Sequence, residues 1–198
     1  MLALVERVGV FGGTFDPVHV GHLVAAVNAR HALGLDRVLM VVAHDPWQKS
    51  DRRVTPAEDR FAMVEAAVAG HDGLEASRLE IDRGGVSYTA DTLEALATAR
   101  PGAELFLVVG SDVAADLGTW ERPEDVRRLA TLAVVDRPGA AIADLGPGWR
   151  TRRVAIPHLE VSGSDLRRRA AAGLPLDWLV PAPVIAYISA RGLYAGGR

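Results

Sequence analysis

His19 and His22 lie three residues apart, a spacing that places both imidazole rings on one face of the first turn of a helix. Gly12 and Gly13 come shortly before them and leave the backbone open to close approach by a phosphate group. The helix that follows would offer unpaired N–H groups and the positive end of its dipole to the same anion. The pattern therefore predicts a phosphate site at which two imidazoles donate hydrogen bonds.

Two other interpretations of the histidine pair stay open at this point. Two histidines at this spacing can bind zinc, but no third ligand stands near them in the sequence, so we expect no metal site. The rings could also cap the helix or pack against it without any ligand. The stretch is neither the GxGxxG dinucleotide fingerprint nor a P-loop, because it lacks the Gly-Lys-Ser/Thr ending.

Four further side chains could bind a ligand. Lys49 is the only lysine, and its compact ammonium suits a phosphate, although a loop lysine is usually a solvated charge. Thr89 stands where a helix would begin, and backbone amides there could bind a carboxylate or simply be capped. Trp120 offers a flat ring for stacking, although a tryptophan is more often part of a core. Asp112 follows an apolar strand and could face a ligand or cap a helix.

Apolar runs alternate with segments of helical periodicity, which predicts an α/β fold: a doubly wound, Rossmann-like parallel sheet with helices on both faces. We expect strands over 8–11, 38–42, 74–81, 105–109, 132–135 and 154–156. We expect helices over 20–33, 56–70, 90–100, 123–130, 165–172 and 183–191, with Thr55, Thr89 and Ser164 as N-caps. No domain boundary stands out, so residues 1–198 should form a single domain whose last ~35 residues are a helical part packed on the rest.

Composition excludes several classes of protein. The chain has 198 residues, 49% of them hydrophobic and 24% charged, which is enough to bury a core. The absence of cysteine excludes disulfides, thiolate metal sites and a cysteine nucleophile, and it fits the cytoplasmic location that we expect. A net charge of −3 argues against a nucleic-acid partner. We also expect no signal peptide and no membrane partner, because no apolar run approaches the ~20 residues of a membrane span.

The stretch Gly-Gly-Thr-Phe-Asp-Pro-Val-His-Val-Gly-His at 12–22 resembles the His-x-Gly-His signature of the nucleotidylyl transferase superfamily. Its longer form is similar to that of bacterial nicotinate mononucleotide adenylyltransferases of the actinobacterial type. Pro-Trp-Gln-Lys at 46–49 and Ser-Tyr-Thr-Ala-Asp-Thr-Leu at 87–93 are also similar to stretches of that family. Val-Ser-Gly-Ser-Asp-Leu-Arg at 161–167 resembles the second signature, Ile-Ser-Ser-Thr-x-Ile-Arg, but Gly163 replaces a serine and Ser164 a threonine. The resemblance runs from Val8 to Tyr194.

The resemblance implies that the AMP moiety of ATP is joined to nicotinate mononucleotide, giving nicotinate adenine dinucleotide and pyrophosphate in NAD biosynthesis. The 5′-phosphate of the mononucleotide would attack the α-phosphorus of ATP, and ATP would bring Mg²⁺ held mostly by phosphate and water. Positioning and electrostatics would carry the rate, so no side chain needs to act as a nucleophile. The partners would be these two small molecules, and self-association into a homo-oligomer stays open.

The same resemblance implies roles for individual residues. The catalytic side chains would be His19, His22 and Arg167. Lys49 would contact the mononucleotide phosphate, and Trp120 would stack on the pyridine ring. The residues expected to bind ATP are Gly12, Gly13, Thr14, Phe15, His22, Asp112, Ser162, Ser164 and Arg167, and those expected to bind the mononucleotide are Lys49, Tyr88, Thr89 and Trp120.

Three other residues in or near these stretches are not expected to contact a substrate. Asp91 lies in the first turn of the helix that would bind the nicotinate carboxylate, so we expect its charged side chain to point away. Tyr187 and Tyr194 also look typical of the family, and we assign both to packing.

Three rival functions remain. The acceptor could be nicotinamide mononucleotide or phosphopantetheine, although phosphopantetheine adenylyltransferases lack the double glycine and the Tyr-Thr segment. The altered second signature also leaves room for a sensor that binds nucleotide without turnover. Aminoacyl-tRNA synthetases carry a related signature, but this chain has neither a basic face nor room for tRNA-binding parts. A panel of acceptors, with pyrophosphate release as the readout, separates these functions.

Overall fold

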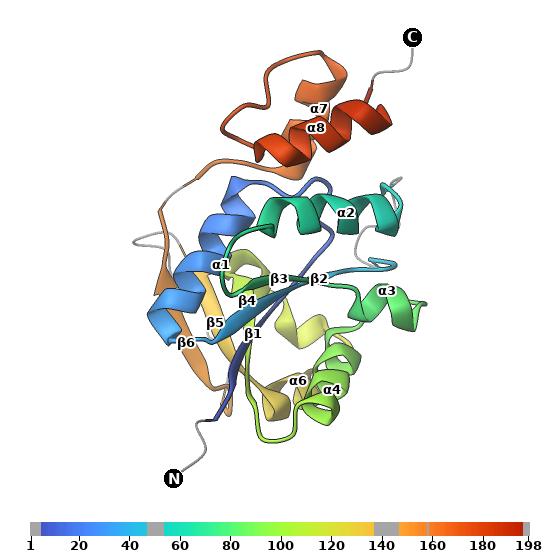
Figure 1. The fold of residues 1–198 in the computed structure, drawn as a ribbon. Helices are drawn as coiled ribbons and strands as arrows, with labels where there is room; N and C mark the ends of the chain where they lie inside the picture. Colours follow the sequence, from blue (N-terminus) through green and yellow to red (C-terminus); the bar gives the residue numbers. More distant parts are fainter. Residues whose placement is uncertain (1–4, 47–53, 137–146, 158, 196–198) are drawn as a thin grey trace.

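The computed structural model describes residues 5–46, 54–136, 147–157 and 159–195, and its centre is a six-stranded sheet (Figure 1). The strands pair in the order β3-β2-β1-β4-β5-β6, and every pair is parallel. Their bounds are β1 (Arg7–Gly13), β2 (Arg37–Val42), β3 (Leu74–Ser77), β4 (Glu104–Gly110), β5 (Ala130–Asp136) and β6 (Thr151–Ala155). The predicted doubly wound parallel sheet is confirmed.

Helices cover both faces of this sheet, as expected. Figure 1 shows α7 (Gly163–Ala171) and α8 (Ala182–Arg191) as the uppermost layer, next to α2 (Ala57–Val68). The helical elements are α1 (Val20–Leu33), α2 (Ala57–Val68), α3 (Leu79–Arg83), α4 (Thr89–Ala99), α5 (Ser111–Ala115), the 3-10 turn η2 (Leu117–Thr119), α6 (Pro123–Leu129), α7 (Gly163–Ala171) and α8 (Ala182–Arg191).

Alternate residues of each central strand enter two separate cores. In β2, Val38 and Met40 pack with α1, α2 and α8, whereas Leu39 and Val41 pack with α4 and α6 on the other face. Because both faces are buried, the strands appear in the sequence as unbroken apolar runs rather than as an alternating pattern. None of the helices in the described ranges combines the length and apolar character needed to cross a bilayer.

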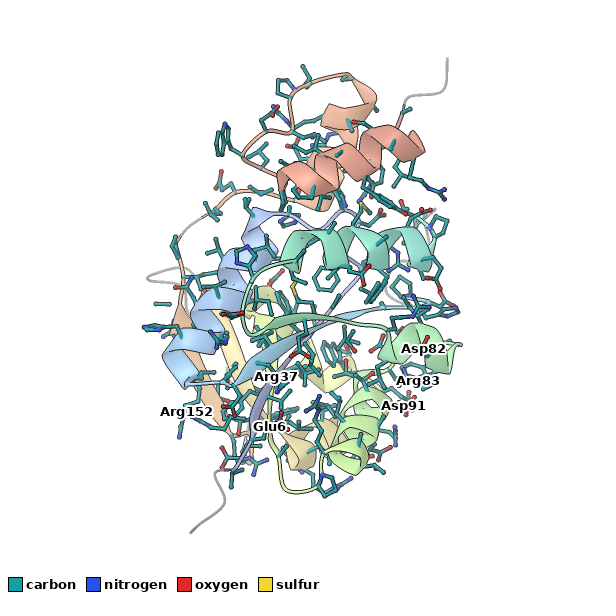
Figure 2. The ribbon with its side chains drawn as sticks, in the orientation of Figure 1. Glu6, Arg37, Asp82, Arg83, Asp91 and Arg152 are labelled. Atoms are coloured by element: carbon teal, nitrogen blue, oxygen red, sulfur yellow. The ribbon has the colours of Figure 1, made fainter. Side chains whose placement is uncertain are left out.

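Ion pairs hold the amino ends of the central strands together. Glu6, just before β1, pairs with Arg37 of β2 at 3.0 Å and with Arg100, which follows α4, at 2.8 Å. Figure 2 shows Glu6 and Arg37 near the same end of the sheet. Half-exposed pairs of this kind contribute little individually. The opposite end of β1 and β4, where the chain order of the sheet reverses, is the switch point at which doubly wound folds bind ligands.

Three predicted boundaries are wrong, and a local hydrogen bond explains one of them. The strand expected over 74–81 ends at Ser77, and Leu79–Arg83 forms α3. The N-cap of α7 is Ser162, whose Oγ accepts a hydrogen bond from the backbone of Asp165 at 3.2 Å, and not Ser164. Tyr88 precedes α4, so Thr89 is a helical residue and not the N-cap.

The N-cap predicted at the start of α2 is also wrong. Pro56, not Thr55, occupies the N-cap position, and no side chain caps this helix end. The carbonyl of Thr55 instead accepts a hydrogen bond from Arg60 at 2.7 Å. α5 was not predicted at all, because a five-residue helix directly after a strand leaves no periodic pattern.

The C-terminal part lies against the rest of the chain through α8, which packs on α2. Tyr187 and Arg191 of α8 both donate to Asp59 of α2, at 2.8 and 3.2 Å. Tyr187 therefore does more than the packing expected of it. That residues 1–198 form one domain stays a prediction.

Candidate active site

A cavity of ≈ 520 Å³ lies at the carboxyl ends of β1 and β4, at the switch point of the sheet. Lys49 lies outside the described residues. Every other residue predicted for the site lines the cavity: Gly12, Gly13, Thr14, Phe15, His19, His22, Tyr88, Thr89, Asp112, Trp120, Ser162, Ser164 and Arg167. The fold thus gathers four segments that are far apart in the sequence around one space.

The turn between β1 and α1 is built around Phe15. A side chain at Gly13 would meet the Phe15 ring at 2.8 Å, so only glycine fits there. Phe15 has a positive φ of 50° and is 2% exposed, and its ring meets the His22 ring edge-on at 5.0 Å between centroids. A side chain at Gly12 would meet nothing within 4 Å, so this glycine leaves open space for a ligand. The Phe15 ring therefore supports the His22 ring, and it is almost entirely buried.

The two histidines are held as neutral hydrogen-bond donors. The backbone N–H of His19 donates to Nδ1 of His22 at 3.2 Å, which places the proton of the neutral His22 ring on Nε2. Burial lowers the pKa of His19 to about 4. Burial, and then repulsion by His19, hold the pKa of His22 well below its usual value of 6.5. A side chain at Gly21 would meet His19 Nδ1 at 3.1 Å, so this glycine gives the rings room.

The second signature brings α7 onto the turn after β1. Nη1 of Arg167 donates to the carbonyl of Asp16 at 2.6 Å, and Nη2 donates to Oγ of Ser164 at 3.0 Å. A side chain at Gly163 would meet the same Asp16 carbonyl at 2.9 Å. The glycine that replaces the family's serine therefore permits a close approach of the two backbones. Ser164, which does not cap α7, has a hydroxyl that orients Arg167.

The start of α4 faces another part of the cavity through Tyr88 and Thr89. Asp91 in the same turn does not line the cavity and forms an ion pair with Arg122, so the expectation that it points away is confirmed. Trp120 also lines the cavity and packs against the core below it, and its Nε1–H has no hydrogen-bond partner among the described residues.

Asp112 lies at the end of β4, where the sequence predicted an acidic side chain facing the ligand. It stands in the first turn of α5, lines the cavity and is exposed. Its carboxylate lies directly over Gly110, where a side chain would collide with it. The carboxylate is therefore available to hydroxyl groups of a ligand.

Sequence reasoning missed three buried polar residues at the site. Glu80 lines the cavity and accepts a hydrogen bond from the hydroxyl of Thr92 at 2.5 Å. Arg60 is 1% exposed and donates to the carbonyls of Thr14 and His44, at 2.9 and 3.1 Å, so it joins the turns after β1 and β2. Asp16 is 5% exposed and also lines the cavity. Asp16 stood inside the glycine–histidine stretch, whereas nothing in the sequence marks Glu80 or Arg60.

Residues 10–169 match the cytidylyltransferase-like family. The chain is 45% identical over 191 residues to a "Probable nicotinate-nucleotide adenylyltransferase" of Corynebacterium kroppenstedtii, covering 95% of this chain and 90% of that protein. It is 44% identical over 186 residues to a protein of the same name from Streptomyces coelicolor, covering 93% and 99%.

A solved structure has a similar fold at low sequence identity. It is the nicotinic acid mononucleotide adenylyltransferase of Plasmodium falciparum complexed with NaAD, with a TM-score of 0.80 and 18% identity, covering 96% of this chain and 97% of that one. Such a likeness supports the fold and not the individual site contacts.

Proposed function

The chain belongs to the cytidylyltransferase-like family, and from this premise we propose that it joins the AMP moiety of ATP to nicotinate mononucleotide and releases pyrophosphate. A relative named "Probable nicotinate-nucleotide adenylyltransferase" is 45% identical to this chain over 191 residues, which are 90% of its own length. This similarity supports the activity expected from the sequence. The observation that carries the proposal is the single cavity in which His19, His22 and Arg167 meet the start of α4.

The two histidines would act on the phosphate that is transferred. The attacking group is the phosphate of the mononucleotide, so the protein needs to align two anions and stabilise the charge that grows on the α-phosphate and the bridging oxygen. Because His22 carries its proton on Nε2, this atom can donate to those oxygens as their charge increases. The neutral rings supply donors without pulling the ground-state phosphate into a tight ion pair.

Arg167, Ser162 and Ser164 would hold the β- and γ-phosphates. Arg167 brings a permanent positive charge, and its contacts to Asp16 and Ser164 fix where that charge lies. The N-terminus of α7 adds unpaired N–H groups at the same wall of the cavity. ATP would enter as its Mg²⁺ complex, in which phosphate oxygens and water supply most of the ligands. In the described ranges no three histidine or acidic side chains are grouped to hold a metal ion.

The start of α4 and Trp120 would bind the pyridine end. Backbone N–H groups at Tyr88 and Thr89 can donate to a nicotinate carboxylate, and the ion pair with Arg122 keeps the charge of Asp91 away from it. Trp120 would stack on the ring, and Lys49 would contact the mononucleotide phosphate. A cytoplasmic location belongs to the same proposal, and self-association into a homo-oligomer stays open.

A panel of acceptors tests the function. The purified protein is given ATP and Mg²⁺ with nicotinate mononucleotide, nicotinamide mononucleotide or phosphopantetheine, and pyrophosphate release is followed. We expect the highest kcat/KM with nicotinate mononucleotide. A preference for another acceptor would assign the chain to a rival function. Binding of ATP without turnover of any acceptor would make it a sensor.

A further inference from the structure

Asp16 lies between the turn after β1 and two side chains from the C-terminal part of the chain. Its carboxylate is 2% exposed, which makes its hydrogen-bond partners decisive for its orientation. Tyr194 donates its hydroxyl to Oδ1 at 2.7 Å. Among the described residues Oδ2 accepts no hydrogen bond, and its nearest positive group is Nη1 of Arg167 at 3.7 Å. The bond from Tyr194 is therefore what fixes the rotation of this carboxylate.

The hydroxyl of Tyr194 is a reliable donor at any ordinary pH. Burial, and then the nearby charge of Asp16, raise the pKa of Tyr194 well above its usual value of 10. The backbone of Tyr194 has a positive φ of 62°, which turns its ring back toward the body of the protein after Gly192 ends α8. The ring packs against the core shared with α2 and α8.

Arg167 is the group that depends on this arrangement. It already donates to the backbone carbonyl of Asp16, and it lies just beyond hydrogen-bond distance of the Asp16 carboxylate. A carboxylate released from Tyr194 would be a buried charge with two unpaired oxygens, and rotation would let it take Arg167 as a bidentate partner. That ion pair would compete with the triphosphate for the same guanidinium.

We propose that Tyr194 is a positioning residue for ATP: its hydroxyl holds the Asp16 carboxylate so that Arg167 stays available to phosphate. The inference rests on the proposed function for the identity of the substrate. This role goes beyond the packing that we assigned to Tyr194. A phenylalanine at position 194 would pack equally well but would lack the hydroxyl that donates to Asp16.

Tyr194→Phe tests the proposal, and Tyr187→Phe is its matched control. Tyr187 also donates to a buried carboxylate, Oδ1 of Asp59 at 2.8 Å, but this bond joins α8 to α2 away from the cavity. We expect Tyr194→Phe to raise the KM for ATP about tenfold, the scale of a hydrogen bond to a charged group, and to leave the KM for nicotinate mononucleotide unchanged. Tyr187→Phe should lower the melting temperature about as much as Tyr194→Phe does, but it should change neither KM.

A second variant separates positioning from loss of structure. In an Asp16→Asn background the competing negative charge is gone, so adding Tyr194→Phe should raise the KM for ATP by much less than it does in the wild type. An unchanged KM for ATP in Tyr194→Phe, an equal rise for both substrates, an equal effect of Tyr187→Phe, or full additivity with Asp16→Asn would each overturn the inference. Wild-type protein without adenylyltransferase activity would instead overturn the proposed function. Calorimetric titration of each variant with a non-hydrolysable ATP analogue would then still test the role of Tyr194.

Discussion

The rings of His19 and His22 are stacked, with centroids 3.7 Å apart and planes inclined by 26°. Two imidazolium ions at this distance would repel each other strongly, and burial lowers both pKa values below the usual 6.5. The stack is therefore compatible with neutral rings. The proposed reaction of two anionic substrates then needs positive charge from other groups, and we propose Arg167, Lys49 and the cation that accompanies ATP for this role.

Removing the His19 ring should slow the reaction without unfolding the protein. We expect His19→Ala to lower kcat by ~10²–10³, the scale of one lost transition-state donor. Nδ1 of His19 has no hydrogen-bond partner among the described residues, so its removal leaves no donor or acceptor unpaired and we expect the protein to stay folded. His31→Ala, on the exposed side of the same helix, is the control. A kcat close to wild type in His19→Ala would remove His19 from the mechanism.

Stability should fall as the pH is lowered through the range below neutrality, in part because of His19. Its pKa is about 4 in the folded protein and 6.5 in the unfolded chain, so between these values the unfolded chain binds more protons and is favoured as the pH falls. The full effect is on the order of 3 kcal/mol. Urea unfolding at pH 7.5 and pH 5 should therefore show a smaller loss of stability in His19→Gln than in the wild type. Equal losses would contradict a buried, neutral His19.

Lys49 lies outside the described residues, and its role stays a prediction from the sequence. Lys49→Ala should raise the KM for nicotinate mononucleotide and leave the KM for ATP near its wild-type value, because a point charge on the mononucleotide phosphate is lost. Steady-state kinetics with each substrate varied in turn measures both constants. Lys49→Arg keeps the charge and should lose less. If Lys49→Ala binds the mononucleotide normally, the lysine is a solvated charge.

Restoring the family's serine at position 163 should harm this protein. The new Cβ would meet the Asp16 carbonyl at 2.9 Å, so either α7 or the turn after β1 has to move. A strained contact of this kind costs ~1–3 kcal/mol, and we expect Gly163→Ser to lower the melting temperature and raise the KM for ATP. Gly118→Ser is the control, because a side chain there meets nothing within 4 Å. Tighter ATP binding in Gly163→Ser would show that the missing hydroxyl matters more than the close approach.

The sequence predicted the sheet well because its strands are buried on both faces. Unbroken apolar runs such as 105–109 indicate strands of a parallel sheet when helical segments separate them. The prediction failed between 74 and 81, where loose alternation suggested one strand. Glu80 lies in α3, and its buried carboxylate accepts a hydrogen bond from Thr92, twelve residues later. The local alternation of residue types could not indicate this contact.

The predicted site residues came together for a related reason. Short motifs such as 12–22 carry their own turn chemistry, so their residues can be recognised locally. Arg60 and Tyr194 could not be recognised in that way, because each acts on the turn after β1 from a distant part of the chain. The sequence around Arg60 or Tyr194 does not indicate whether the side chain faces solvent or a buried partner.

The contact between Asp16 and Tyr194 spans 178 positions of the chain. A ribosome adding about 5–20 residues per second needs roughly ten to forty seconds to pass from one to the other. All six strands emerge before Tyr194 does, so the growing chain can pair its sheet before the hydroxyl that holds Asp16 has been made. The Asp16 carboxylate therefore gains the partner that we propose for it only after Tyr194 has been added to the growing chain.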